Sequence, residues 1–170
     1  MSGTIGAGKT AIAEAASGLL TDAGTPHGLI DLDWLCQAYP APPEDPFHNE
    51  LGFENLAAVW PQYEARGIGT LVVARVIESR HWRDRCEHAM AGAAITVVRL
   101  DASRSTRRAR IEARELDPRW RDRFLSRTDE LEAILDRDDV ADLHVDNDRR
   151  SPRDVASEML EKAGWLGQER

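Results

Sequence analysis

The segment Gly3-Thr4-Ile5-Gly6-Ala7-Gly8-Lys9-Thr10 matches the phosphate-binding pattern G-x-x-x-x-G-K-[ST]. Glycines let the backbone curl so that several N–H groups point at one oxyanion, and a following helix adds its positive end. Lys9 can reach the β- and γ-phosphates, and the Thr10 hydroxyl can hold a Mg²⁺ ion. The segment therefore predicts a nucleoside triphosphate site. A disordered Gly/Ala-rich terminus is the alternative, but residues 10–20 are typical of the helix that must follow.

The predicted nucleotide contacts are the loop and the first turn of that helix: Gly3, Thr4, Ile5, Gly6, Ala7, Gly8, Lys9, Thr10 and Ala11. A loop of this kind normally follows a buried β-strand. Only Met1 and Ser2 precede Gly3, so the sequence leaves no room for the strand. Either the true start lies upstream of Met1, or the sheet lacks its central strand. We favour the first explanation, because an absent central strand would leave backbone groups and apolar surface unpaired.

Size and composition are typical of one soluble domain covering residues 1–170, with 42% hydrophobic and 31% charged residues. The net charge of −8 argues against a nucleic-acid partner held by phosphate neutralisation. No stretch has the length of a transmembrane helix, and no signal peptide is visible. Cys36 and Cys86 lie in no metal or redox motif. We expect a cytoplasmic protein, monomeric or homodimeric, with no membrane partner.

Helical and strand patterns alternate along the chain, which is typical of a parallel sheet with helices on both faces. The prediction is an α/β protein with the three-layer αβα P-loop NTPase fold and a mostly parallel sheet that lacks its first strand. Strands are expected at about 28–33, 70–74, 94–100 and 143–145. Helices are expected at about 9–23, 55–66, 80–90, 103–115, 121–136 and 151–164. Between them, the proline-rich residues 34–54 predict a substrate-side loop, and residues 115–121 a short lid.

Two carboxylates, Asp31 and Asp33, lie where the first predicted strand ends. Ligands of open α/β sheets bind at the carboxyl ends of the strands, and alternation sends both side chains to the same side. Asp33 is the preferred candidate because it lies further toward the ligand. It could hold Mg²⁺ together with Thr10, or accept the proton of an attacking hydroxyl. The alternative is an acid that caps the turn at Trp34.

Nine arginines occur between Arg104 and Arg127, although the chain is acidic overall. Phosphoryl transfer needs positive charge over the transferring group. Arg107, Arg110 and Arg114 recur at three and four residues, so they share one face of a helix. Arg114 ends that helix just before the predicted lid. The alternative is a solvated helix whose arginines pair with interleaved acids.

With these features, the chain resembles the small P-loop kinases of the gluconate kinase and shikimate kinase type, within the nucleoside-monophosphate-kinase-like group. The resemblance spans nearly the whole chain but is specific only at residues 3–10. It implies a role for Asp33 near Mg²⁺ and the substrate hydroxyl, and nucleotide or phosphate contacts for Arg110 and Arg114. Arg149, after Val145-Asp-Asn-Asp148, stands where such kinases pass the adenine. The histidine–phenylalanine lid signature of gluconate kinases and the shikimate-binding glycine triplet are missing, so neither substrate carries over.

These observations lead to one hypothesis: an ATP- and Mg²⁺-dependent kinase of a small hydroxylated molecule, with Lys9, Asp33 and Arg114 as catalytic residues and Thr10 and Asp33 as metal ligands. The acceptor class stays open and includes antibiotics, nucleotides and sulfate-activation intermediates. A non-catalytic ATP-binding module, or an NTPase that needs a partner, is the alternative from another class, because no acid follows the strand at 70–74. The preference for ATP over GTP is not fixed by the sequence.

Overall fold

Four short parallel strands form the centre of the protein, whose computed structural model describes residues 1–166. The strands are β1 (Gly28–Asp31), β2 (Leu71–Ala74), β3 (Val98–Asp101) and β4 (Leu143–Asp146). β1 pairs with β2, with Asp31 opposite Ala74, and β3 pairs with β4, with Asp101 opposite Asp146. All four carboxyl ends therefore lie along one edge.

Met1 and Ser2 connect the two pairs of strands. The Met1 carbonyl accepts from the amide of Arg75, just after β2, and Ser2 forms a parallel bridge with Arg99 of β3. Burial lowers the pKa of the Met1 amino group, which donates to the carbonyl of Val73, to about 6. Beneath this bridge, Met1, Val73 and Val97 help to line a cavity of about 80 Å³. Among the described residues, no strand precedes the phosphate-binding motif, as predicted.

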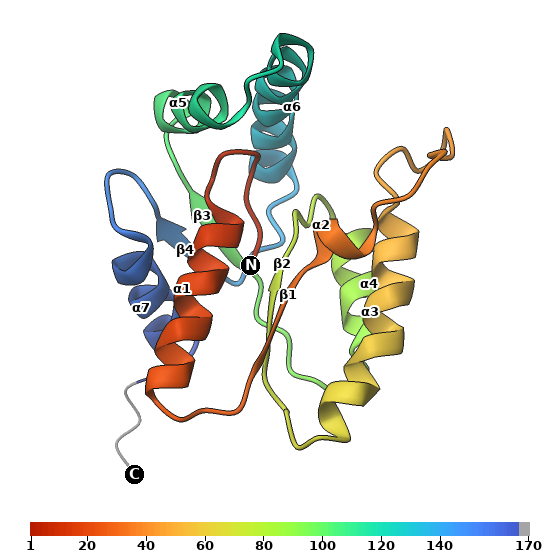
Figure 1. The fold of residues 1–170 in the computed structure, drawn as a ribbon, viewed down its shortest axis with the longest axis vertical. Helices are drawn as coiled ribbons and strands as arrows, with labels where there is room; N and C mark the ends of the chain where they lie inside the picture. Colours follow the sequence, from red (N-terminus) through yellow and green to blue (C-terminus); the bar gives the residue numbers. More distant parts are fainter. Residues whose placement is uncertain (167–170) are drawn as a thin grey trace.

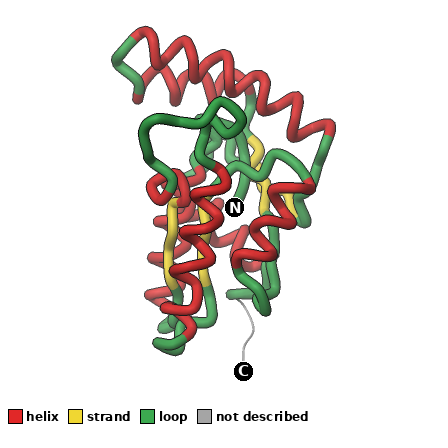
Figure 2. Tube along the Cα trace, turned by 90° about the vertical axis from the view of Figure 1, so that its right-hand side faces the viewer, coloured by secondary structure: helices red, strands yellow, loops and turns green. Residues whose placement is uncertain are grey.

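Seven helices are described in residues 1–166: α1 (Lys9–Asp22), α2 (Leu32–Leu35), α3 (Asn49–Glu64), α4 (Arg80–Ala89), α5 (Arg104–Arg114), α6 (Pro118–Arg137) and α7 (Pro152–Lys162). α1 and α7 pack together on one face of the strands, and α3 packs on α4 at the other face, beside β1 and β2 (Figure 1). The view turned by 90° shows the strands running between helices (Figure 2). The predicted layered α/β fold is confirmed.

Each face of the strands has its own apolar core. On one face, Ile12 and Leu20 of α1 pack with Val145 and Leu160. On the other, Phe53 and Trp60 of α3 belong to the cluster that contains Ile30, Ile77 and Cys86. None of the described helices has both the length and the apolar composition needed to span a bilayer.

Several predicted boundaries are wrong, each for a local reason. β1 ends at Asp31, not residue 33, because the Asp31 carboxylate caps the helical turn α2. α3 begins at Asn49, six residues early, because the Asp45 carboxylate accepts from the first two backbone amides of the helix. α6 begins at Pro118, because Asp117 caps it and proline fits the first turn.

The third predicted strand is also shorter than expected. It begins at Val98 rather than residue 94. Residues 94–97 line the small cavity under Met1, where the neighbouring strand position is not filled, so they lack a partner on that side. The closing helix agrees better: the Ser151 side chain caps α7, with Pro152 at its first position, as the sequence indicates.

Candidate functional site

Residues 3–8 form a tight loop at the carboxyl edge of the strands, directly before α1 (Figure 1). Gly6 has φ 81° and Gly8 has φ 94°, which are left-handed conformations that side chains disfavour. A Cβ added to Gly6 would lie 2.7 Å from the carbonyl oxygen of Arg107. The glycines are therefore required both by the backbone conformation and by the close approach of α5.

The loop presents amide groups that have no acceptor within the protein. In residues 1–166, the backbone N–H groups of Ile5, Gly6 and Gly8 donate to no described atom. The amides of the first turn of α1 are also unpaired by the geometry of a helix terminus. An anion is the partner that such converging donors fit. The geometry of the loop therefore fits a phosphate group.

Lys9 lies under the same loop. Its Nζ atom donates to the carbonyl oxygens of Gly3 at 3.0 Å and of Thr4 at 3.1 Å. Burial lowers the pKa of the Lys9 ammonium below its ordinary value, while the carboxylates of Asp33 and Asp31 oppose that shift. The ammonium therefore lies beside the unpaired amides of the loop, in a position where burial disfavours its charged form.

Side chains from distant elements hold the loop in this shape. Thr128 of α6 is fully buried and donates to the Ile5 carbonyl at 2.7 Å, and the Asn147 amide donates to the Ala7 carbonyl. The guanidinium of Arg110 donates to the Gly6 carbonyl at 3.2 Å and to the Asn147 carbonyl at 2.9 Å. Thr128 and Asn147 were not predicted as site residues, because nothing in the local sequence marks contacts with residues more than 100 positions away.

The hydroxyl of Thr10 donates to Asp31 Oδ2 at 2.6 Å. The structure thus brings Asp31, and not the preferred Asp33, against Thr10. The expectation that both carboxylates lie on the strand is wrong for Asp33, which belongs to α2. Oxygen ligands of this kind suit Mg²⁺, which commonly binds one or two carboxylates together with phosphate oxygens. Thr10 and Asp31 therefore form the pair of side chains that fits a metal beside the loop.

Asp33 projects from α2 toward the same cleft and forms an ion pair with Arg75. Arg75 is buried, and its guanidinium also donates to Asn49 Oδ1 of α3 and to Cys36 Sγ. The guanidinium fixes the orientation of a carboxylate that is itself more than half exposed. Arg75 was not predicted as a site residue. Its signal was a charged residue directly after the apolar strand 71–74.

A single cavity of about 920 Å³ joins these groups. Its volume is at the upper end of the range of ordinary ligand pockets. One end is lined by the loop and α1, including Lys9 and Thr10. Other parts of its wall come from Asp33, Arg75, nine of the residues between 36 and 49, and α6. Lys9 and Asp33 therefore line the same space.

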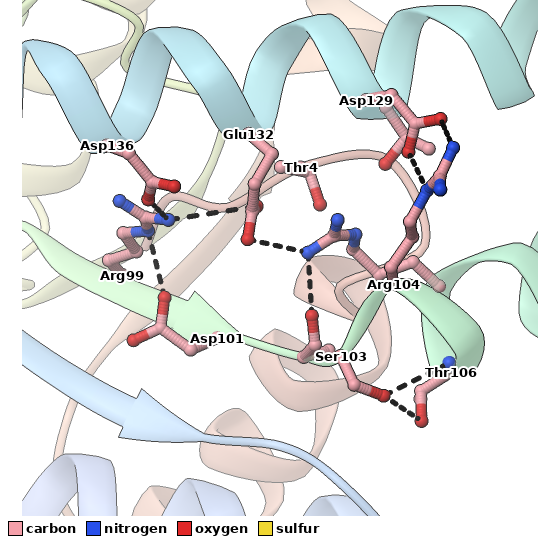
Figure 3. Close-up of polar contacts among 12 residues, drawn as sticks. Thr4, Arg99, Asp101, Ser103, Arg104, Thr106, Asp129, Glu132 and Asp136 are labelled. Carbon is pink, nitrogen blue, oxygen red and sulfur yellow. Dashed lines mark hydrogen bonds and ion pairs between the residues drawn. The ribbon is translucent and has the colours of Figure 1, made fainter.

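The arginine-rich segment divides into structural and cleft-lining residues. Arg107 is buried and pairs with Glu132 of α6 at 2.8 Å, so it holds α5 against α6. Arg99 of β3 lies between Asp101 and two acids of α6, Glu132 and Asp136, as Figure 3 shows. This network fixes the middle of α6 above the strands.

Of the remaining predicted arginines, Arg110 and Arg114 line the cavity, and Arg114 is exposed at the end of α5. Arg149 lies in the turn after β4 with φ 52°, is exposed, and is not among the residues that line the cavity. Within the loop itself, Gly3, Thr4 and Ala7 are buried, while Ile5, Gly6, Gly8 and Ala11 line the cavity. The structure therefore brings together most, but not all, of the predicted residues.

Comparison with solved structures places this geometry among known folds. The gluconokinase of Sinorhizobium meliloti 1021 superposes with a TM-score of 0.63 at 21% sequence identity, covering 97% of this chain and 90% of that chain. Shikimate kinase from Acinetobacter baumannii gives 0.59 at 16% identity, covering 98% and 92%. Deoxyadenosine kinase from M. mycoides gives 0.50 at 13%, covering 96% and 97%.

Sequence comparison gives no further relatives, since no family model and no curated protein matches this chain. At these identities the likeness concerns the fold and not the substrate. It extends over nearly the full length of all three kinases. The chain therefore has the fold of the small P-loop kinases, as its motif and alternating pattern indicate.

Proposed function

We propose that this protein is an ATP-dependent phosphotransferase that phosphorylates a hydroxyl group of a small molecule. One observation carries the proposal. A single cavity is lined by a loop of unpaired amides, by Lys9 and Thr10, and by an exposed carboxylate, Asp33, and Asp31 accepts from Thr10 beside the loop. A phosphoryl donor and a hydroxyl acceptor need these groups around one space.

The donor end supplies positive charge and hydrogen-bond donors. The amides of residues 5–11 and the Lys9 ammonium are proposed to bind the β- and γ-phosphates. Arg114 is proposed to cover the transferring group, because it is exposed on the cavity at the end of α5. Arg110 and, beyond the cavity, Arg149 are proposed to flank the nucleotide base.

Thr10 and Asp31 are proposed to hold Mg²⁺, with Asp33 as a further ligand candidate. The ion, when bound, neutralises phosphate charge and orients the phosphate oxygens. Asp33 has a second proposed role as the base that takes the proton of the acceptor hydroxyl. Arg75 holds its carboxylate toward the cleft, so the base is oriented before the acceptor arrives.

The decisive test is ADP release with Mg·ATP over a panel of alcohols, on the wild type and on Lys9→Ala. We expect turnover stimulated by an acceptor and reduced by roughly 10²–10³-fold in Lys9→Ala, the range for removing one group that stabilises transition-state charge. Affinity for a fluorescent ATP analogue should fall in parallel. An affinity for the ATP analogue that is unchanged in Lys9→Ala would overturn the proposal. Lys9-dependent binding without stimulated turnover would favour a non-catalytic ATP-binding module.

A further inference from the structure

Aromatic side chains from two separate elements line the cavity. Tyr39 and Phe47 come from the proline-rich segment 36–48, and Trp120 and Phe124 come from α6. Tyr39 is 97% exposed, Trp120 49% and Phe47 41%. Large rings left in water at the mouth of a pocket mark a surface that is covered when a ligand binds.

Several of these rings are held in place. The guanidinium of Arg127 lies 5.1 Å from the centre of the Phe47 ring, and both carboxylate oxygens of Glu78 accept from Arg127. This stack ties segment 36–48 to α6. The rings of Trp120 and Phe124 are 6.0 Å apart, with Arg123 5.5 Å from the Trp120 ring. Rings fixed before binding lose little entropy when a ligand arrives.

The cations beside these rings are held differently. Arg75 is paired with Asp33 and Arg127 with Glu78, whereas Arg123, which lies against Trp120, forms no ion pair among the described residues. An anionic acceptor would have to compete with these carboxylates for the two guanidinium groups. An uncharged ring needs no such exchange, because it gains from leaving water and from contact with the aromatic faces.

We infer that the acceptor is an alcohol with a planar ring, held by the aromatic side chains that line the cavity: Tyr39, Phe47, Trp120 and Phe124. The inference rests on the proposed function and names its substrate class. The transfer forms a bond between the acceptor oxygen and the γ-phosphorus and breaks the bond from that phosphorus to the β-phosphate oxygen. The hydroxyl proton passes to Asp33, and ADP leaves.

Two sets of probes test this inference on the full chain with Mg·ATP. Thymidine and 4-nitrobenzyl alcohol carry a planar ring, whereas gluconate and glycerol do not. We expect kcat/KM to be at least about tenfold higher for a ring-bearing probe, since one well-placed aromatic contact is worth about a factor of ten. Preference for gluconate or glycerol would overturn the inference.

Variants locate the effect. Trp120→Ala and Phe47→Ala should raise KM for the ring-bearing probe about tenfold, with less change in kcat, and Trp120→Phe should retain most of the affinity. Trp34→Ala is the matched control, because Trp34 is 71% exposed but does not line the cavity. Affinity for a fluorescent ATP analogue should be unchanged in all four. An unchanged KM in Trp120→Ala and Phe47→Ala contradicts the inference.

Binding separates this inference from the proposed function. If no probe is phosphorylated, saturation-transfer NMR on the protein with Mg·ADP measures contact with the same four probes. Ring contact that is lost in Trp120→Ala supports the aromatic site even when phosphotransfer fails. Equal or absent contact for all probes overturns the aromatic site, whatever the outcome for ATP.

Discussion

The phosphate end and the acceptor end of the cleft are built from opposite kinds of contact. At the phosphate end, side chains from α5, α6 and the turn after β4 donate to the carbonyls of three loop residues, Ile5, Gly6 and Ala7, so little is left to move. At the acceptor end, segment 36–48 and the start of α6 expose rings that the rest of the protein does not cover. A phosphoryl donor that is common to many enzymes needs one fixed binding geometry. The acceptor site is the region in which proteins of related fold differ.

The largest expected effect separates two carboxylates, Asp33 on the wall of the cavity and Asp31 beside Thr10. Asp33→Asn should lower kcat by roughly 10²–10⁴-fold, because it removes the proposed base. Asp31→Asn should instead raise the Mg²⁺ concentration needed for half-maximal activity, because Asp31 contacts Thr10. Magnesium titrations of ADP release on both variants measure this. A shared phenotype would show that the two carboxylates serve one metal.

The rigidity of the phosphate end can be broken at Gly6. Gly6→Ala combines a left-handed φ with a Cβ only 2.7 Å from the Arg107 carbonyl, so the loop or α5 must shift. We expect a loss of about 1–3 kcal/mol in the free energy of unfolding and weaker ATP binding. Urea denaturation measures the first and a fluorescent ATP analogue the second.

Gly18→Ala is the matched control for that variant. Gly18 lies within α1, and a Cβ there meets nothing within 4 Å. Alanine should stabilise the helix by roughly 0.5–1 kcal/mol. A destabilised Gly18→Ala, or an unaffected Gly6→Ala, would contradict the account of the loop.

A matched pair of variants sharpens the comparison itself. Thr128→Val keeps the shape of a fully buried side chain but leaves the Ile5 carbonyl without its donor, so unfolding should become easier by about 1–2 kcal/mol. Tyr39→Ala, at the exposed acceptor end, should change stability by no more than about 0.5 kcal/mol. Urea denaturation of both proteins decides the point. Equal losses would mean that the two ends are equally tied to the fold.

The smallest expected effect is a pH dependence far from the cleft. A hydrogen bond from His144 to Asp101, with the nearby Asp139, raises the pKa of His144 above its ordinary value. Its contribution to stability is therefore fully present below about pH 6.5 and is lost as the pH rises through the folded-state pKa. Because the side chain is half exposed, the effect should stay below about 1 kcal/mol.

Urea denaturation at pH 5.5 and pH 8.5 checks this, with His144→Gln as the control. The wild type should lose more stability than the variant between these two values. The same change of pH should leave ATP binding unchanged, because His144 connects β4 to β3 and to residue 139 and does not contact the loop. A larger pH effect in His144→Gln would contradict the assignment.

Prediction from sequence succeeded where the signal is local. The loop at residues 3–8, the helix after it and the alternation of strands and helices each follow from neighbouring residues, and so does the capped start of α7 at Ser151. Errors arose where a side chain met a distant partner. The acid beside Thr10 is Asp31, and the guanidinium of Arg110 donates to carbonyls of the loop and of Asn147. No spacing in the sequence encodes these contacts.

By itself, the sequence determined the loop at residues 3–8 and the layered α/β fold, because backbone conformation and periodicity are properties of short segments. The tertiary structure alone decided which groups share the cleft. It placed Arg75 against Asp33, Thr128 under the loop, and four aromatic rings on the wall of the same cavity. These residues lie far apart in the chain, so only packing of the strands and helices between them sets their distances. The lining of the cavity is therefore a property of the fold rather than of any motif.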